Sequence, residues 1–125
     1  MSPHGKYKIE LIGNVVHVFP TGGFNEQGIR QMHKEIASIA PKIKPWALLE
    51  HPKDIAGLTP EAIEELVSCY KSLSSINCVV AALQISGAWQ GVFETRIVDK
   101  VNIPVYLDCD LALLEKQITH ILDNI

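Results

Sequence analysis

Three short apolar segments, at residues 46–49, 78–83 and 103–107, constrain the fold of this chain more than any other feature. Each has the length of a strand, and a stretch with the apolar periodicity of a helix separates each from the next. Segments that are apolar at successive positions are typical of strands with both faces covered, as in a parallel sheet. Parallel strands joined by helices need right-handed crossovers, so the pattern predicts an α/β fold.

The other elements complete the expected order. Residues 7–12 and 15–19 flank the turn signal Gly13-Asn14 and predict a β-hairpin, with residues 20–23 ending its second strand. We expect helices at residues 25–39, 59–73, 88–99 and 111–125, and a loop at residues 50–58. The prediction is a single mixed, mostly parallel five-stranded sheet with four helices, in the order ββαβαβαβα.

Length and composition fit one globular domain. The 125 residues predict a single domain over residues 1–125, with residues 1–6 as a flexible N-terminus. The net charge is -3 and the basic residues are scattered, which argues against a nucleic-acid surface. No stretch approaches the ~20 apolar residues of a bilayer span, and no signal peptide opens the chain. We therefore expect a cytoplasmic protein with no membrane insertion and no nucleic-acid partner.

The sequence shows no pattern for catalysis, metal or cofactor. Cys69, Cys78 and Cys109 are odd in number and widely spaced, which fits neither a disulfide framework nor a zinc site with paired ligands. The histidines form no His-x-His or His-Glu-x-x-His pattern. There is no Gly-x-Ser-x-Gly elbow and no Gly-rich phosphate loop. We therefore predict no catalytic residues, no metal site, no cofactor and no enzyme activity.

Four stretches of the sequence share the pattern of one family. They are residues 16–25, residues 54–58 with the sequence Asp-Ile-Ala-Gly-Leu, residues 79–83 with the helix at 89–98, and residues 103–107 with 111–114. Together they resemble the STAS domain, the fold of the bacterial anti-sigma-factor antagonists, and in particular its SpoIIAA-like branch, which is often grouped with SEC14-type domains. The resemblance covers residues 7–125 and implies this fold and a regulatory module that binds a protein partner.

The chain departs from that family at two positions. The antagonists are switched by phosphorylation of a serine in an Asp-Ser-Ser-Gly loop, whereas here both serine positions are apolar, Ile55 and Ala56. The resemblance thus implies a non-catalytic binding module without the family's phosphorylatable serine. The SEC14 association implies, as an alternative, a carrier of a small apolar or lipid-like ligand.

The segment before the second helix holds four candidate ligand- or partner-binding residues, His51, Asp54, Gly57 and Thr59. His51 and Asp54 follow a central strand, where open α/β sheets place their ligands. A solvated loop is the competing interpretation, because loops are usually polar. Thr59 begins a helix, but Glu61 and its acidic neighbours occupy the positive end of that helix, so we expect no bound phosphate.

Trp89 and Phe93 are the other two candidates, because they lie one turn apart and share a face of the helix at 88–99. One interpretation is that both side chains pack in the core. The alternative is a partly open apolar surface that receives a partner helix, a second copy of the chain or a lipid-like ligand. Gly87 and Gly91 would let another backbone or a ligand approach closely. We expect Trp89 to pack on the edge of the sheet with one side open.

Three functions stay open. They are a regulatory module that binds a protein partner or forms a homodimer, a carrier of a small apolar ligand, and an enzyme of unknown chemistry. A contiguous exposed apolar patch would favour the first, and a cavity lined by Trp89, Phe93 and side chains of the second helix would favour the second. A buried polar cluster with perturbed pKa values would favour the third. The regulatory module ranks first, and the sequence identifies neither its partner nor its pathway.

Overall fold

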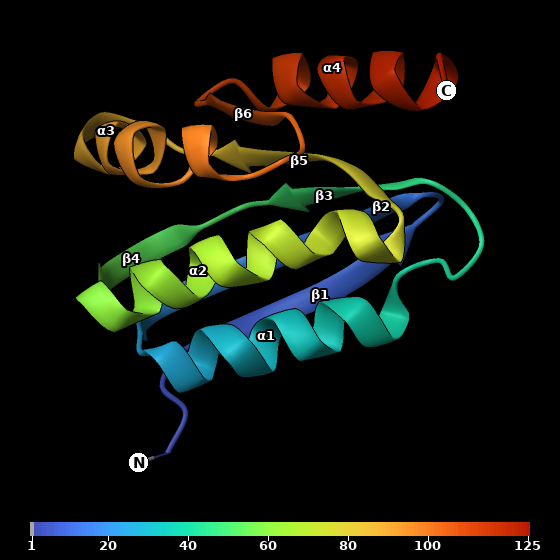
Figure 1. Ribbon diagram of the computed structural model, residues 1–125. Helices are drawn as coiled ribbons and strands as arrows, with labels where there is room; N and C mark the ends of the chain where they lie inside the picture. Colours follow the sequence, from blue (N-terminus) through green and yellow to red (C-terminus); the bar gives the residue numbers. More distant parts are fainter. Residues whose placement is uncertain (1) are drawn as a thin grey trace.

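The computed structural model describes residues 2–125, which form one six-stranded sheet and four α-helices (Figure 1). The strands are β1 (Lys6–Ile12), β2 (Val15–Phe24), β3 (Trp46–Glu50), β4 (Lys53–Leu58), β5 (Cys78–Gln84) and β6 (Val105–Asp108). The helices are α1 (Glu26–Ile39), α2 (Pro60–Leu73), α3 (Gly87–Arg96) and α4 (Leu111–Asp123), with 3-10 turns at Ser74–Ile76 and Val98–Lys100. The predicted α/β class and the four helices are confirmed. No helix in the described residues combines the length and the apolar character needed to cross a membrane.

The sheet has the order β1-β2-β3-β5-β6, and β4 pairs with β2 beyond the end of β3. The hairpin of β1 and β2 is antiparallel, with Ile9 opposite Val18, and the other strand pairs are parallel. All residues of β3 are buried, as predicted for a strand with both faces covered. β6 lies at an edge, where Pro104 before it costs no ladder hydrogen bond.

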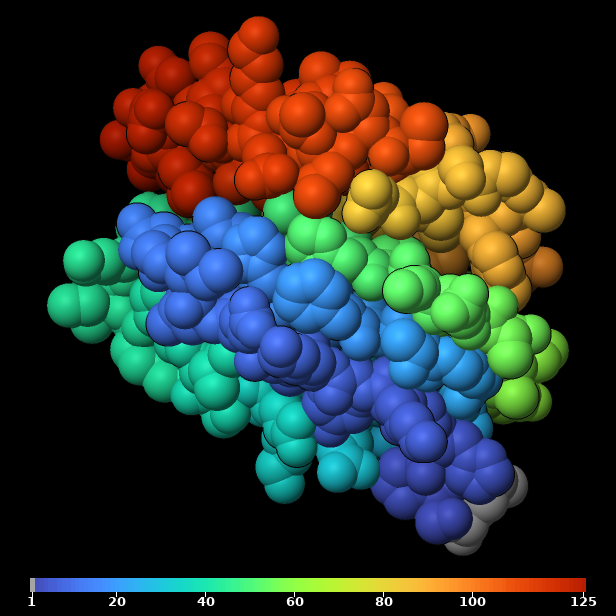
Figure 2. Space-filling view, turned by 180° about the vertical axis from the view of Figure 1, so that it is seen from behind, coloured from blue at the N-terminus to red at the C-terminus, as the bar shows by residue number. Residues whose placement is uncertain are grey.

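Helices cover the two faces of the sheet unequally. α1, α2 and α3 pack on one face around a core that includes Ile36, Leu66 and Phe93. α4 packs on the other face through Leu114 and Ile118, over β3, β5 and β6. Figure 2 shows this second face, where β1 and β2 lie at the surface beside α4. The sheet therefore has a thick side with three helices and a thin side with one.

Side-chain caps fix where three helices begin. Asn25 Oδ1 accepts a hydrogen bond from the N–H of Gly28 at 2.9 Å. Thr59 Oγ1 accepts one from the N–H of Ala62 at 3.0 Å, and Asp110 Oδ1 accepts one from the N–H of Leu113 at 3.3 Å. Each satisfies a backbone donor that the first turn of a helix leaves without an intrahelical partner. Asn25, Thr59 and Asp110 are thus the N-caps of α1, α2 and α4.

The start of the chain packs against the beginning of α1. Asn25 accepts a hydrogen bond from the N–H of His4 at 2.9 Å and donates one to the carbonyl of Ser2 at 3.0 Å. A Cβ added at Gly28 would lie 1.9 Å from the carbonyl oxygen of His4, so this position requires glycine. The flexible N-terminus stays a prediction, and its first residue lies outside the described part of the chain.

Three predictions about element boundaries were wrong. Residues 50–58 are not a loop, because they contain the end of β3 and the whole of β4, which gives six strands rather than five. β2 does not end at Pro20 but continues to Phe24, because pairing with β4 extends the strand through a local turn signal. α3 ends at Arg96, and a 3-10 turn replaces its expected last residues.

Candidate functional site

A pocket of about 650 Å³ opens at the carboxyl end of the sheet, where β5 ends and β4 continues. β3 and β4 lie end to end along β2, with Val18 opposite Glu50 and Thr21 opposite Lys53. β5 pairs with β3 as far as Glu50 and ends one residue later, at Gln84, which pairs with β6. Within residues 2–125, no strand pairs with the second edge of β4. The pocket occupies the space beside that edge.

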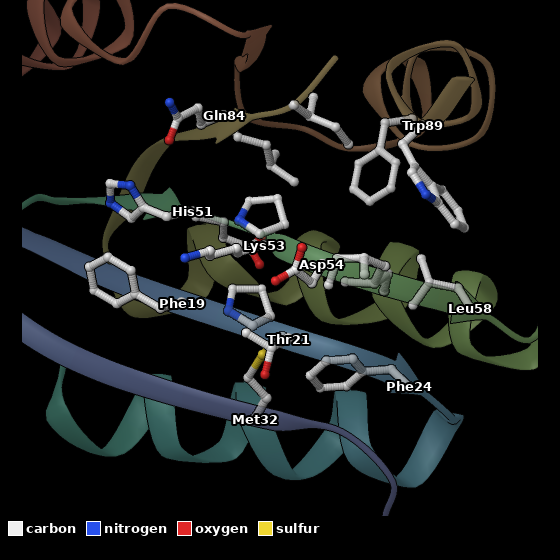
Figure 3. Close-up of a pocket in the computed structure, with 18 of the residues that line it drawn as sticks. Phe19, Thr21, Phe24, Met32, His51, Lys53, Asp54, Leu58, Gln84 and Trp89 are labelled. Atoms are coloured by element: carbon white, nitrogen blue, oxygen red, sulfur yellow. The ribbon is translucent and has the colours of Figure 1, made fainter. Parts of the chain in front are cut away.

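Apolar side chains form most of the pocket wall, and nearly all of them belong to the core under α1, α2 and α3. They are Phe19 and Phe24 of β2, Ile29 and Met32 of α1, Ile55 and Leu58 of β4, Leu66 of α2, Leu83 of β5, and Trp89 and Phe93 of α3. Figure 3 shows Trp89 on one side of the cavity, with Phe24 and Met32 across from it. The volume and the apolar wall are typical of a site for a small molecule.

One carboxyl group lies inside this apolar wall. Glu50, the last residue of β3, is only 3% exposed and lines the pocket. The hydroxyl of Tyr70, on α2, donates a hydrogen bond to Glu50 Oε2. Burial raises the pKa of Glu50 to about 7, and the hydrogen bond from Tyr70 offsets part of that effect. Glu50 therefore exchanges its proton near neutral pH.

A buried histidine extends this pair. The ring of His33, on α1, lies 5.5 Å from the ring of Tyr70 between centroids, at an interplanar angle of 56°. Neither ring nitrogen of His33 has a hydrogen-bond partner in the described residues, and burial lowers the pKa of His33 to about 4. Burial and the nearby Glu50 raise the pKa of Tyr70 well above its usual range. We call Glu50, Tyr70 and His33 the buried polar cluster, of which Glu50 lines the pocket.

The rim of the pocket is polar. His51 stacks on Phe19, with ring centroids 4.5 Å apart, and its Nε2 lies 3.0 Å from Nδ1 of His17. Burial and the nearby His17 lower the pKa of His51, so its ring acts near neutral pH as an uncharged hydrogen-bonding group. Lys53 and Asp54 are exposed on β4, and Asp54 has a left-handed backbone, with φ of 52°, where the pairing of β4 with β2 shifts.

The structure brings four of the six predicted site residues together. His51, Asp54, Trp89 and Phe93 line the pocket, and Trp89 is half-buried, as expected for a ring with one open side. Gly57 and Thr59 lie instead at a shallower depression of about 420 Å³ near the start of α2. The hydroxyl of Thr59 is engaged there in the helix cap.

The sequence reasoning missed the buried polar cluster and Phe19. One signal for Glu50 was present, because a carboxylate that directly follows four residues of a buried strand has little access to water. Neither Tyr70 nor His33 was singled out in the sequence. No local pattern links these residues, since they meet only when α1 and α2 pack on β3.

The side chains near the pocket differ in the chemistry that they can support. Among residues 2–125, no group of three or more His, Cys, Asp or Glu side chains is placed to hold a metal ion. The raised pKa of Tyr70 leaves its hydroxyl protonated, so it cannot serve as a base near neutral pH. Burial, together with the nearby Glu65, raises the pKa of Cys69 to about 12, which removes it as a nucleophile. Glu50 can exchange a hydrogen bond or a proton with a bound molecule.

Searches against family models and curated proteins gave no match to the chain. Solved structures gave several. A protein of the DUF3478 family with a SpoIIAA-like fold, from Shewanella loihica PV-4, superposes with a TM-score of 0.66 at 14% identity, covering 94% of this chain and 96% of its own. An anti-sigma factor antagonist from Mycobacterium paratuberculosis gives 0.65 at 13% identity, covering 93% and 95%.

SpoIIAA itself is also similar. The unphosphorylated anti-sigma factor antagonist SpoIIAA superposes with a TM-score of 0.63 at 11% identity, covering 91% of this chain and 98% of its own. All three matches extend over nearly the whole of both chains, so the likeness concerns the complete topology and not one motif. The chain therefore has the SpoIIAA-like fold, that of the STAS domain which its sequence resembles.

Proposed function

We propose that this chain is a non-catalytic binding module that holds a small, largely apolar molecule at the carboxyl end of its sheet. The observation that carries the proposal is the pocket of about 650 Å³, with Trp89, Phe93 and Leu66 of α2 in its wall. A cavity of this kind was the feature that would favour a ligand carrier over the other functions. Its size falls in the range of about 300–1,000 Å³ typical of small-molecule sites.

The buried polar cluster, with its perturbed pKa values, is the feature that would favour an enzyme, but its members do not form a nucleophile–base pair in the pocket. Nucleophilic catalysis needs a nucleophile beside a base that a third group orients. Tyr70 and Cys69 are held protonated by their raised pKa values, and His33 does not line the pocket. Glu50 is the member of the cluster that a ligand would touch. A buried carboxyl in an apolar wall orients a ligand, while His51, Lys53 and Asp54 lie at the polar rim of the pocket.

Binding of 1-octanol tests this function. Calorimetry should show saturable binding to one site, and Trp89→Ala should weaken it about tenfold, because the ring forms one wall of the cavity. Ile43→Ala is the matched control, since Ile43 is 90% exposed and lies outside the pocket. Urea melts would show that both variants stay folded. Unsaturable binding, or equal affinity in the wild type and Trp89→Ala, would reject the proposal.

Regulation through a protein partner is the second candidate, favoured by the two anti-sigma factor antagonists among the similar structures. β4 would connect the two functions, because Ile55 lines the pocket while its neighbour Ala56 is exposed. An anti-sigma factor should then bind the wild type, and Ala56→Arg should abolish that complex while leaving octanol binding unchanged. Absence of any complex with the wild type would reject this candidate. Homodimer formation and a cytoplasmic location stay predictions.

A further inference from the structure

The chemistry around Glu50 indicates what kind of molecule the pocket accepts. Building on the binding function proposed above, we infer that the ligand is an apolar amine, whose protonated nitrogen is received by the carboxylate of Glu50 and whose hydrocarbon body lies against the aromatic wall.

The carboxyl of Glu50 has unused hydrogen-bonding capacity. An ionised carboxylate accepts up to about four hydrogen bonds. In the described residues, the hydroxyl of Tyr70 is the donor to Glu50, and it reaches Oε2. No Lys or Arg of residues 2–125 forms an ion pair with Glu50. A buried carboxylate without a cation is costly, so a cationic group entering the pocket gains a strong partner.

Aromatic side chains form part of the wall around that carboxyl. Phe19, Phe24, Trp89 and Phe93 line the same cavity. Aromatic faces attract an ammonium group electrostatically and also pack against hydrocarbon. In an amine with an alkyl or aryl body, the ammonium group would therefore interact with Glu50 and the aromatic faces, and the hydrocarbon would pack against the same rings.

The pocket disfavours a negatively charged ligand. A fatty acid would bring a second carboxylate against Glu50 in apolar surroundings, and two like charges there cannot both stay ionised. Asp54 at the rim adds to that repulsion, although Lys53 beside it offsets part. A neutral alcohol fits the apolar wall but leaves the charge of Glu50 without a cation. Among ligands with the same hydrocarbon chain, the amine should bind most tightly.

A protonated amine would also change the proton uptake of the site. It stabilises the ionised form of Glu50, so binding expels the proton that the empty pocket holds. Because the pKa of Glu50 is about 7, octylamine should bind about tenfold more tightly at about pH 8 than at about pH 6. Octylamine itself stays protonated over this range, as lysine does.

Other groups near Glu50 contribute less to this dependence. The titratable and charged side chains around it are Tyr70 and Cys69 of α2, His33 of α1, His51 after β3, Lys53 and Asp54 of β4, and Cys109 after β6. The pKa values of Tyr70 and Cys69 are raised and those of His33 and His51 are lowered, which keeps all four uncharged near neutral pH. Glu50 therefore carries the main change of charge.

Calorimetry with octylamine, 1-octanol and octanoate tests whether the ligand is an amine, because the three probes have the same chain length and differ only in the polar group. The wild type should bind octylamine most tightly and release nearly one proton per amine at about pH 6, measured in buffers of different ionisation enthalpy. Glu50→Gln keeps the shape and the hydrogen bond with Tyr70, and should lose about tenfold or more of the octylamine affinity together with the proton release. It should keep its affinity for octanol. Glu64→Gln, exposed on α2 and outside the pocket, should behave as the wild type.

The outcomes separate this inference from the function on which it rests. Octylamine affinity that is equal in the wild type and Glu50→Gln, or octanoate binding tighter than octylamine, would overturn the amine assignment, while octanol binding that depends on Trp89 would still uphold the pocket. Failure of all three probes would overturn both. Should Glu50→Gln not fold, Tyr70→Phe serves instead: losing the hydrogen bond raises the pKa of Glu50, so the pH midpoint of octylamine binding should move upward. An unchanged midpoint would also reject the role of Glu50.

Discussion

The three cysteine thiols lie in contrasting surroundings, which allows a test of burial at single residues. Cys78 is buried at the start of β5, whereas Cys109 is exposed after β6. Burial raises the pKa of Cys78 to about 12, and only the thiolate reacts with alkylating reagents. In the native protein, iodoacetamide should therefore modify Cys109 at least about 100-fold faster than Cys78.

Peptide mapping after timed labelling gives both rates in one sample. Denatured protein is the control, in which the two thiols should react at similar rates. Cys69 is half-buried and should also lag behind Cys109. Rapid native labelling of Cys78 would mean that β5 does not lie inside the sheet.

At the same scale, the site was predictable where a residue's position follows from one element. His51 and Asp54 were found because ligands gather at the carboxyl ends of parallel strands, and Trp89 and Phe93 because helical spacing puts them on one face. Glu50 and Tyr70 could not be paired from sequence. Twenty residues separate them, and their contact depends on how α2 packs over the sheet.

Between elements, the buried polar cluster links the stability of the fold to pH in two opposing ways. His33 has a pKa of about 4 when folded and about 6.5 when unfolded, so the unfolded chain binds more protons and stability rises with pH across this window. Glu50 has a pKa of about 7 when folded and about 4.5 when unfolded, so the folded chain keeps the proton and stability falls as pH rises. From about pH 4.5 to 6.5 the two effects should largely cancel.

Single substitutions should reveal the two slopes. In this range the free energy of unfolding of His33→Gln should decrease with pH, and that of Glu50→Gln should increase, each by up to about 1.4 kcal/mol per pH unit. Urea unfolding at a series of pH values measures both. His120→Gln, an exposed position on α4, is the control and should follow the wild type. Slopes of the same sign in the two cluster variants would contradict the assignment.

Element order was largely predictable, because each helix carries its own cap and apolar stripe. The caps at Asn25 and Thr59 are local signals that tertiary packing did not override. β4 was missed for the opposite reason. Its sequence, Lys-Asp-Ile-Ala-Gly-Leu, has little of the β-branched and aromatic character of strands, and its extended form comes from pairing with β2.

For the whole molecule, the sheet should be unequally stable along its length. β3 has hydrogen-bonded neighbours on both edges, whereas in the described structure β4 is paired on one edge. Backbone amides of β4 should therefore exchange with deuterium faster than those of β3, because opening them breaks fewer contacts. A ligand in the pocket should slow exchange in β4, which forms part of its wall. Equal protection of the two strands in the empty protein would contradict this difference.

The end-to-end placement of β3 and β4 along β2 also bears on how such a chain diverges. Substitutions or insertions that reshape β4 alter one wall of the pocket, while the pairing of β3 with β5 and the helices packed over it are untouched. The β4 side chains of the wall can thus vary separately from the core residues that line the rest of the pocket. Proteins with this fold can therefore change the ligand that they bind through substitutions in the six residues of β4, without first acquiring a compensating mutation in the core.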